Sequence, residues 1–167
     1  MAGTTSGWLR AGRVGRAHGL DGSFYVLEAT APLLELDRTV LIGERERKIV
    51  RRAGTDTRPI LRLEGCEDRD AARSLAGAEL LVARAQAPEL EADEWWAEDL
   101  EGCAVSDGDR RIGVVRRLLA LPSCEVLEVA REEDAGDLLV PLVSDAVRHV
   151  DLERREIDVD LRFLGEA

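Results

Sequence analysis

The chain has 167 residues and a formal net charge of −11, and 45% of its residues are hydrophobic while only 4% are aromatic. This length suits one ordinary domain or two small ones, with cores built from Ala, Leu and Val. No window holds the roughly eighteen apolar residues that cross a membrane, and the first residues lack the apolar run of a signal peptide, so we expect a cytoplasmic protein without a membrane partner.

The charge is divided unevenly along the chain. Residues 1–84 hold 14 Lys and Arg against 12 Asp and Glu, whereas residues 85–167 hold 9 against 22. A nearly neutral, arginine-rich half and a strongly acidic half favour two units with different partners, such as RNA for the first and a basic protein for the second. Acidic residues that only keep the second half in solution would give the same pattern.

Short alternating apolar runs separated by Gly and Asp predict β-strands throughout the first half. A short helix follows them, with Asp68 as its N-cap, Ala71 and Leu75 on one face, and Gly77 at its end. Gly43 fits a hairpin corner. Six strands and one helix predict a small closed barrel with a helix over one end. The predicted strands span residues 8–17, 22–29, 39–42, 45–51, 60–64 and 79–83.

The second half shows the same kind of pattern after a break. Residues 85–94 contain a proline, several carboxylates and no β pattern, so we predict a linker between domains at 8–84 and 95–167. In the last strand Ile157, Val159 and Leu161 should face inward, and Asp158 and Asp160 should face water. The chain is therefore predicted to be all-β, with two small barrels. The predicted strands of the second span residues 103–106, 112–119, 126–130, 137–141, 147–150 and 156–161.

The stretch RVGRAHGLDGSFYV raises the possibility of a phosphate-binding loop. Its glycine spacing matches neither common Gly-rich phosphate pattern, and a strand rather than a helix follows Gly22. A tight turn, with Gly19 and Gly22 in conformations closed to other residues, explains the spacing better. Arg16 and His18 share one side of the preceding strand, whereas Arg13 is out of phase. They are either a solvated strand end or a contact for phosphate or protein.

The segment ERERKIVRRAG concentrates positive charge on one predicted hairpin. Arg45, Arg47 and Lys48 could follow an RNA backbone there, because each neutralised phosphate contributes to binding. Glu44 and Glu46 alternate with them, so an edge strand protected by its charges is an equal alternative.

The sequence offers no catalytic or metal site. The two histidines, His18 and His149, lie in different halves, and the three cysteines are widely spaced without a CxxC pair. A histidine-pair metal site, a Cys–His nucleophile and a disulfide framework are therefore not predicted. No serine lies in a nucleophile elbow. We expect no catalytic residue, no metal and no cofactor.

Trp95 and Trp96 are the most informative aromatic residues. Neighbouring residues point about 100° apart on a helix and about 180° apart on a strand, so both indoles cannot enter one small core. At least one should face the other domain or solvent. The pair is predicted to be either an interdomain anchor or an exposed contact for a partner protein.

Five motifs in fixed order resemble the RimM family of ribosome maturation factors. They are AGRVGRAHGLDGSFYV, LEGCEDRDAARSLAGAELLV, DEWWAEDLEGCAV, IGVVRRLL and LLVPLVSDAVRHVDLERREIDVDL, and the resemblance runs from about Trp8 to Leu164. It implies a translation-factor-like N-terminal barrel of six strands and a C-terminal PRC-barrel. It also implies a non-catalytic protein that binds the assembling small ribosomal subunit and assists assembly of its head and maturation of its rRNA.

The resemblance also implies partners and contact residues. The family's aromatic pair, usually two tyrosines, falls on Trp95 and Trp96 and is tied to a basic small-subunit protein of the head, the nineteenth. The family's turn beside the first strand falls on residues 18–22. With the arginine hairpin, the expected contacts to small-subunit rRNA or the ribosome are Arg13, Arg16, His18, Gly19, Gly22, Arg45, Arg47 and Lys48. We expect a monomer. The alternatives are a PRC-barrel adaptor for another complex and an enzyme acting on RNA.

Overall fold

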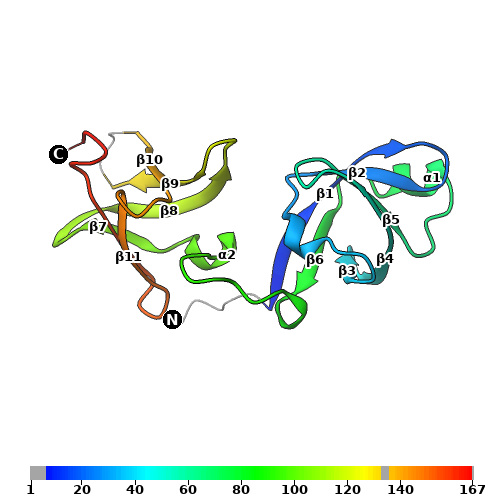
Figure 1. Ribbon diagram of the computed structural model, residues 1–167, viewed down its shortest axis with the longest axis horizontal. Coiled ribbons are helices and arrows are strands. Elements are labelled where there is room, and N and C mark those ends of the chain that lie inside the picture. The colour runs from blue at the N-terminus through cyan, green and yellow to red at the C-terminus, as the bar shows by residue number, and fades with distance from the viewer. Residues whose placement is uncertain (1–6, 133–135, 167) are drawn as a thin grey trace. The chain divides into compact units, whose positions relative to one another are not determined.

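The chain folds into two compact units made almost entirely of β-strands. The computed structural model describes residues 7–132 and 136–166. The first unit ends at Glu91 and the second begins at Ala92; in Figure 1 they run from blue to green and from green to red. Every strand predicted from the sequence is present, with ends shifted by at most three residues. The prediction of an all-β chain with two barrel-like sheets is confirmed.

The first unit is a closed barrel of six strands in the order β1-β2-β5-β4-β3-β6. It closes because β1 pairs with both β2 and β6. Alternate residues of each strand enter the core, and Phe24, Ile49 and Leu61 are fully buried there. The bounds are β1 Trp8–His18, β2 Ser23–Leu27, β3 Thr39–Ile42, β4 Arg45–Gly54, β5 Pro59–Leu63 and β6 Glu79–Ala83.

One short α-helix and two 3₁₀ turns accompany this barrel. Helix α1 spans Arg69–Ser74, and its N-cap is Asp68, whose carboxylate accepts a hydrogen bond of 2.8 Å from the backbone N–H of Ala71, as predicted. Gly77 follows the helix with a φ of +83°. The 3₁₀ turns, η1 at Ala31–Leu33 and η2 at Arg84–Gln86, were not predicted, because three residues give no periodic signal.

The turn between β1 and β2 has the conformation that its glycines predict. Gly19 and Gly22 have φ angles of +66° and +86°. A Cβ added at Gly22 would lie 2.2 Å from the backbone oxygen of Cys66, so only glycine fits. Asp21 accepts a 2.9 Å hydrogen bond from the Arg51 guanidinium. Hydrogen bonding from Ser23, together with the charge of Arg51, lowers the pKa of the Asp21 carboxyl, so the turn is fixed by an ionised side chain.

The second unit is a curled six-stranded sheet in the order β10-β9-β8-β7-β12-β11. Strand β12 pairs with β7 in parallel, while the other pairs are antiparallel. A short helix, α2, spans Ala97–Leu100 and was not predicted. The strand bounds are β7 Ala104–Asp107, β8 Arg110–Ala120, β9 Glu125–Arg131, β10 Leu138–Pro141, β11 Val147–Asp151 and β12 Glu156–Val159.

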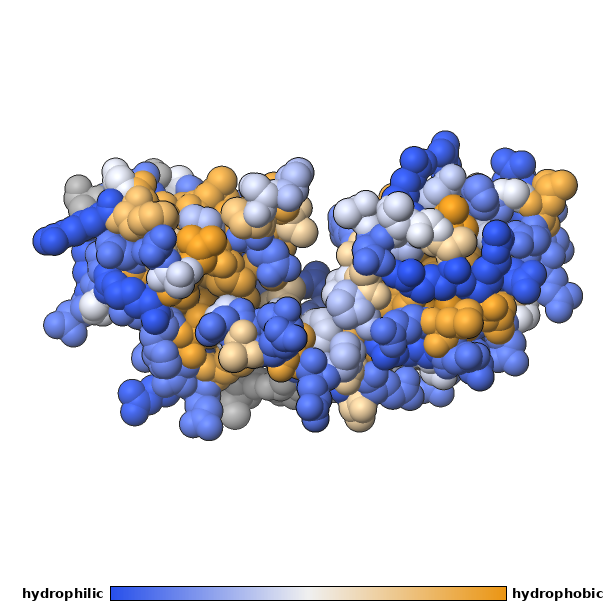
Figure 2. Space-filling model, viewed as in Figure 1, coloured by the Kyte–Doolittle hydropathy of each residue, from blue (hydrophilic) through white to orange (hydrophobic). Residues whose placement is uncertain are grey.

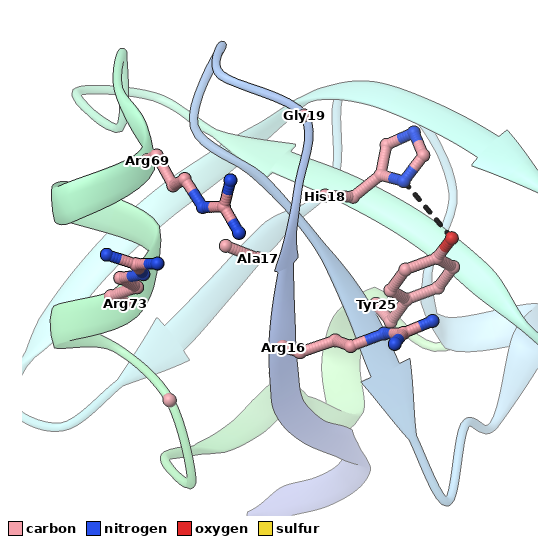
Figure 3. Close-up of a pocket in the computed structure, with 8 residues that line it drawn as sticks. Arg16, Ala17, His18, Gly19, Tyr25, Arg69 and Arg73 are labelled. Carbon is pink, nitrogen blue, oxygen red and sulfur yellow. Dashed lines mark hydrogen bonds between the residues drawn. The ribbon is translucent and has the colours of Figure 1, made fainter.

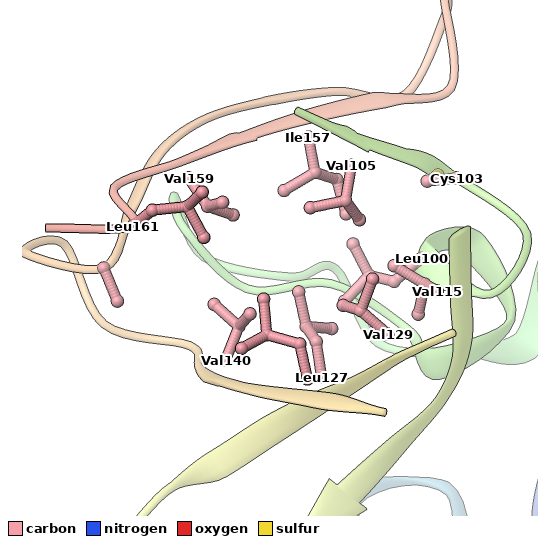
Figure 4. Packing of buried hydrophobic residues seen from close by; sticks show 12 residues of the cluster. Leu100, Cys103, Val105, Val115, Leu127, Val129, Val140, Ile157, Val159 and Leu161 are labelled. Carbon is pink, nitrogen blue, oxygen red and sulfur yellow. The ribbon is translucent and has the colours of Figure 1, made fainter. Parts of the chain in front are cut away.

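The core of the second unit lies inside the curl of this sheet. Figure 4 shows side chains from β7 and β12 meeting those from β8, β9 and β10, with Leu100 of α2 beside them. Ile157, Val159 and Leu161 are buried, as their alternation predicts. Neither α1 nor α2, the α-helices of the described residues, is long and apolar enough to cross a membrane.

Candidate functional site

The first unit has an open hollow beside the end of β1, with a volume of about 390 Å³. It is lined by three arginines, two aromatic rings and three small residues: Arg16, Arg69, Arg73, His18, Tyr25, Ala17, Gly19 and Ala76. Figure 3 shows Arg16 and His18 on one side of β1 and Arg69 reaching toward its other side from α1. The structure thus brings together three of the predicted contact residues, Arg16, His18 and Gly19.

Tyr25 of β2 organises one side of this hollow. Its hydroxyl shares a 3.1 Å hydrogen bond with Nδ1 of His18, and the two rings meet edge to face with centroids 5.1 Å apart. The guanidinium carbons of Arg16 and Arg58 lie 5.1 Å and 4.5 Å from the Tyr25 ring centroid. These cation–π contacts hold two positive charges at fixed positions without neutralising them.

Little negative charge opposes the arginines of the hollow. None of the described residues that line it carries a carboxylate. In the part of the chain that the structure describes, Arg16 and Arg69 form no ion pair, and Arg73 lies 3.8 Å from the exposed Asp70. Exposed pairs at this distance contribute little, so the hollow remains positively charged. Its chemistry is that of an anion site.

The sequence did not single out Tyr25, Arg58, Arg69 or Arg73. Arg69 and Arg73 are four residues apart on α1, a spacing that places both on one helix face. The helix predicted for this segment therefore already indicated that Arg69 and Arg73 lie on the same face. Nothing local indicates that Arg58, in the turn before β5, reaches Tyr25.

The remaining predicted contacts of the first unit lie apart from this hollow or serve the fold. Arg13 is exposed on β1, and a bulge between Val14 and Ala17 interrupts the alternation that placed it out of phase with Arg16. Gly22 is buried beneath Cys66 and has a structural role in the turn.

The basic residues of the β3–β4 hairpin mostly have partners inside the first unit. Arg47 donates a 3.3 Å hydrogen bond to the backbone oxygen of Glu64, and Lys48 lies 3.2 Å from the carboxylate of Asp37. Arg45 is exposed, without an ion pair among the described residues. Arg47 and Lys48 thus have partners within the first unit, while Arg45 remains open to an anion.

The tryptophan pair lies at the start of the second unit. Trp95 is half-buried and packs against the core of that unit, while Trp96 is only 9% exposed. The backbone oxygen of Trp96 accepts a 3.0 Å hydrogen bond from Asp99 in the first turn of α2. The two adjacent indoles thus differ in burial, and neither belongs to the exposed hydrophobic residues of the unit.

Carboxylates accompany the tryptophans. Glu94 directly precedes them, and its charge acts on Glu125 at the start of β9. Loss of hydration raises the pKa of the Glu125 carboxyl, and repulsion from Glu94 raises it further. Among the described residues, no group of three or more His, Cys, Asp or Glu side chains is placed to hold a metal ion.

Two family models match the chain, and together they cover most of it. The RimM N-terminal domain matches residues 9–87, and the RimM PRC barrel domain matches residues 97–163.

Curated relatives match along nearly their whole length. The ribosome maturation factor RimM of Sorangium cellulosum is 36% identical over 87% of this chain and 90% of its own. The protein of the same name from Clostridium botulinum is 30% identical over 90% and 92%. A crystal structure of a RimM protein from Pseudomonas aeruginosa is 28% identical, covers 92% of this chain and 96% of that one, and has a TM-score of 0.42. The chain belongs to the RimM family of ribosome maturation factors.

Proposed function

We propose that this protein is a non-catalytic assembly factor of the small ribosomal subunit in the cytoplasm. The acidic second unit holds the basic ribosomal protein of the head, the nineteenth, at Trp95 and Trp96, while the first unit contacts small-subunit rRNA. Residues 85–94 link the two domains, 8–84 and 95–167. The relatives from Sorangium cellulosum and Clostridium botulinum are named as maturation factors and not as enzymes, which supports a binding role.

The observation that carries the proposal is the excess of carboxylates in the second half of the chain, with Glu94 directly before the tryptophans. Residues 85–167 hold 22 Asp and Glu against 9 Arg and no Lys. The excess negative charge, to which Glu94 and Glu125 contribute, favours a basic protein over an acidic one.

Apolar surface on the second unit also suits a protein partner. Figure 2 shows hydrophobic residues gathered in the middle of its visible face, surrounded by hydrophilic ones. Such patches commonly mark protein contacts. The exposed large hydrophobic residues of this unit are Leu121, Leu139, Val143, Leu152 and Phe163.

Glu125→Gln should weaken the complex with the purified head protein about threefold to tenfold, because one attractive carboxylate is removed. Titration calorimetry of the full chain at low and high salt measures this. We expect affinity to fall steeply as salt rises.

Because the Glu125 pKa is raised, acidification protonates this carboxyl at a higher pH than an ordinary Glu. As the pH falls, the affinity of the wild type for the head protein should therefore begin to drop at a higher pH than an ordinary Glu would cause. The affinity of Glu125→Gln should lack this contribution to the pH dependence.

Glu153→Gln is the matched control, since it removes one exposed carboxylate in the turn between β11 and β12. It should change affinity little. Equal losses in both variants would mean that net charge alone drives binding. Salt-insensitive binding would contradict the electrostatic basis of the proposal.

A further inference from the structure

The hollow of the first unit has the features of a phosphate site more than those of a base-reading site. Arg16 projects from one side of β1, Arg69 reaches toward the other side from α1, and Arg73 lies on α1 one turn further along (Figure 3). Guanidinium groups bind phosphate oxygens through charge-assisted hydrogen bonds that are stronger than neutral ones. Ala17, Gly19 and Ala76 are small, so a bulky phosphodiester group can approach the backbone between the arginines.

The other polar groups of the hollow are occupied with each other. His18 and Tyr25 share their hydrogen bond, and the Tyr25 ring carries the guanidinium of Arg16. Among the described residues, no Asn, Gln, Asp or Glu lines the hollow, so arginine is the main side-chain type there that could also read a base edge. The Tyr25 contact positions Arg16, and phosphate is the group that three arginines without a carboxylate among the lining residues suit best.

We propose that the hollow binds the phosphate backbone of an RNA strand crossing the end of β1, with Arg16 on one side and Arg69 and Arg73 on the other, independently of base sequence. This inference rests on the proposed rRNA contact of the first unit and assigns it to two residues of α1. It also places the contact at the hollow instead of the β3–β4 hairpin, where Arg47 and Lys48 are engaged within the unit.

The test is fluorescence anisotropy of the full chain with two labelled single-stranded RNA oligonucleotides of unrelated sequence, over a range of salt. Arg69→Gln/Arg73→Gln should lower affinity for both RNAs about tenfold. The slope of log affinity against log salt should fall by about 0.7 for each single-strand phosphate that the variant no longer neutralises. Arg16→Gln should act in the same direction. All three side chains lie on the surface rim of the hollow, so the fold should persist, which circular dichroism verifies.

Two control variants distinguish the hollow from the remaining basic surface of the chain. Arg45→Gln removes an exposed charge of the hairpin, and Arg110→Gln removes one from the start of β8 in the second unit. Arg110→Gln should leave RNA affinity nearly unchanged, and Arg45→Gln tests the hairpin as the alternative site. If Arg45→Gln lowers RNA affinity and Arg69→Gln/Arg73→Gln does not, the hairpin binds the RNA. That result would refute the assignment of the contact to the hollow but would leave the proposed rRNA contact of the first unit standing.

A titration with inorganic phosphate tests whether the hollow binds RNA or only small anions. If phosphate raises the thermal stability of the wild type but not of Arg69→Gln/Arg73→Gln, and no RNA binds, the hollow takes small anions only and the inference is wrong. A preference of more than about tenfold for one RNA sequence would refute recognition of the backbone alone. If the wild type binds neither RNA nor phosphate, the proposed rRNA contact fails together with the hollow.

Discussion

Gly22→Ala should destabilise the first unit by about 2–4 kcal/mol. The added methyl would meet the Cys66 backbone oxygen at 2.2 Å, and a φ of +86° is itself unfavourable for alanine. Neither side of this contact is a flexible side-chain end, so the turn or the segment before α1 must move. Urea denaturation followed by circular dichroism measures the loss.

Gly43→Ala is the matched control for this prediction. Gly43 has a φ of +61° in the β3–β4 turn, but its added methyl meets nothing within 4 Å. Gly43→Ala should therefore lower the free energy of unfolding only by the cost of a positive φ for alanine, about 1–2 kcal/mol. Equal losses of stability in the two variants would mean that the close approach to the Cys66 backbone does not restrict position 22 to glycine. Because Gly19 and His18 adjoin this turn, Gly22→Ala should also weaken RNA binding at the hollow.

Leu127→Ala should destabilise the second unit by about 2–5 kcal/mol. Leu127 of β9 is 0% exposed at the centre of the core, as Figure 4 shows, so its truncation leaves a cavity among Val115, Val140 and other apolar side chains. Chemical denaturation measures the change. Binding of the basic ribosomal protein should disappear under conditions where the second unit unfolds.

Leu139→Ala provides the comparison on the neighbouring strand. Leu139 of β10 is 53% exposed and lies opposite Glu128 of β9, so truncation should cost no more than about 0.5 kcal/mol. A large loss at Leu139 and a small one at Leu127 would show that the inward and outward faces of this sheet are reversed.

Most of the fold could be predicted because strands leave strong local signals. Alternation placed Ile157 and Val159 in the core, and the glycines at 19, 22 and 43 marked their turns. The parallel pairing of β12 with β7 could not be predicted, since it joins residues about 50 positions apart and depends on the whole sheet. Helix α2 spans only four residues, too few for a helical period to show.

The candidate site was harder to predict than the fold. Arg16 and His18 were found because they adjoin a recognisable turn, but their partners Tyr25 and Arg58 come from other strands and turns. Counting basic residues in the hairpin also did not reveal internal partners such as Asp37 for Lys48. Charge composition predicts the kind of partner, whereas folding decides which charges stay available.

Affinity capture of small-subunit precursors from a cell lysate shows whether the second unit binds the assembling subunit at its tryptophans. The full-length wild type is compared with Trp95→Ala/Trp96→Ala, and bound material is identified by gel and mass spectrometry. Since Trp96 is buried and Trp95 half-buried, Glu125→Lys serves as a second variant that reverses charge at an exposed site. Circular dichroism confirms that each variant is folded.

The wild type should recover immature small subunits or their basic head protein, and the folded variants should recover at least tenfold less, as expected when central contact residues are removed. Recovery of the same ribosomal material by wild type and both folded variants would place the contact elsewhere. Recovery of no ribosomal material by the wild type would contradict the proposed role in assembly.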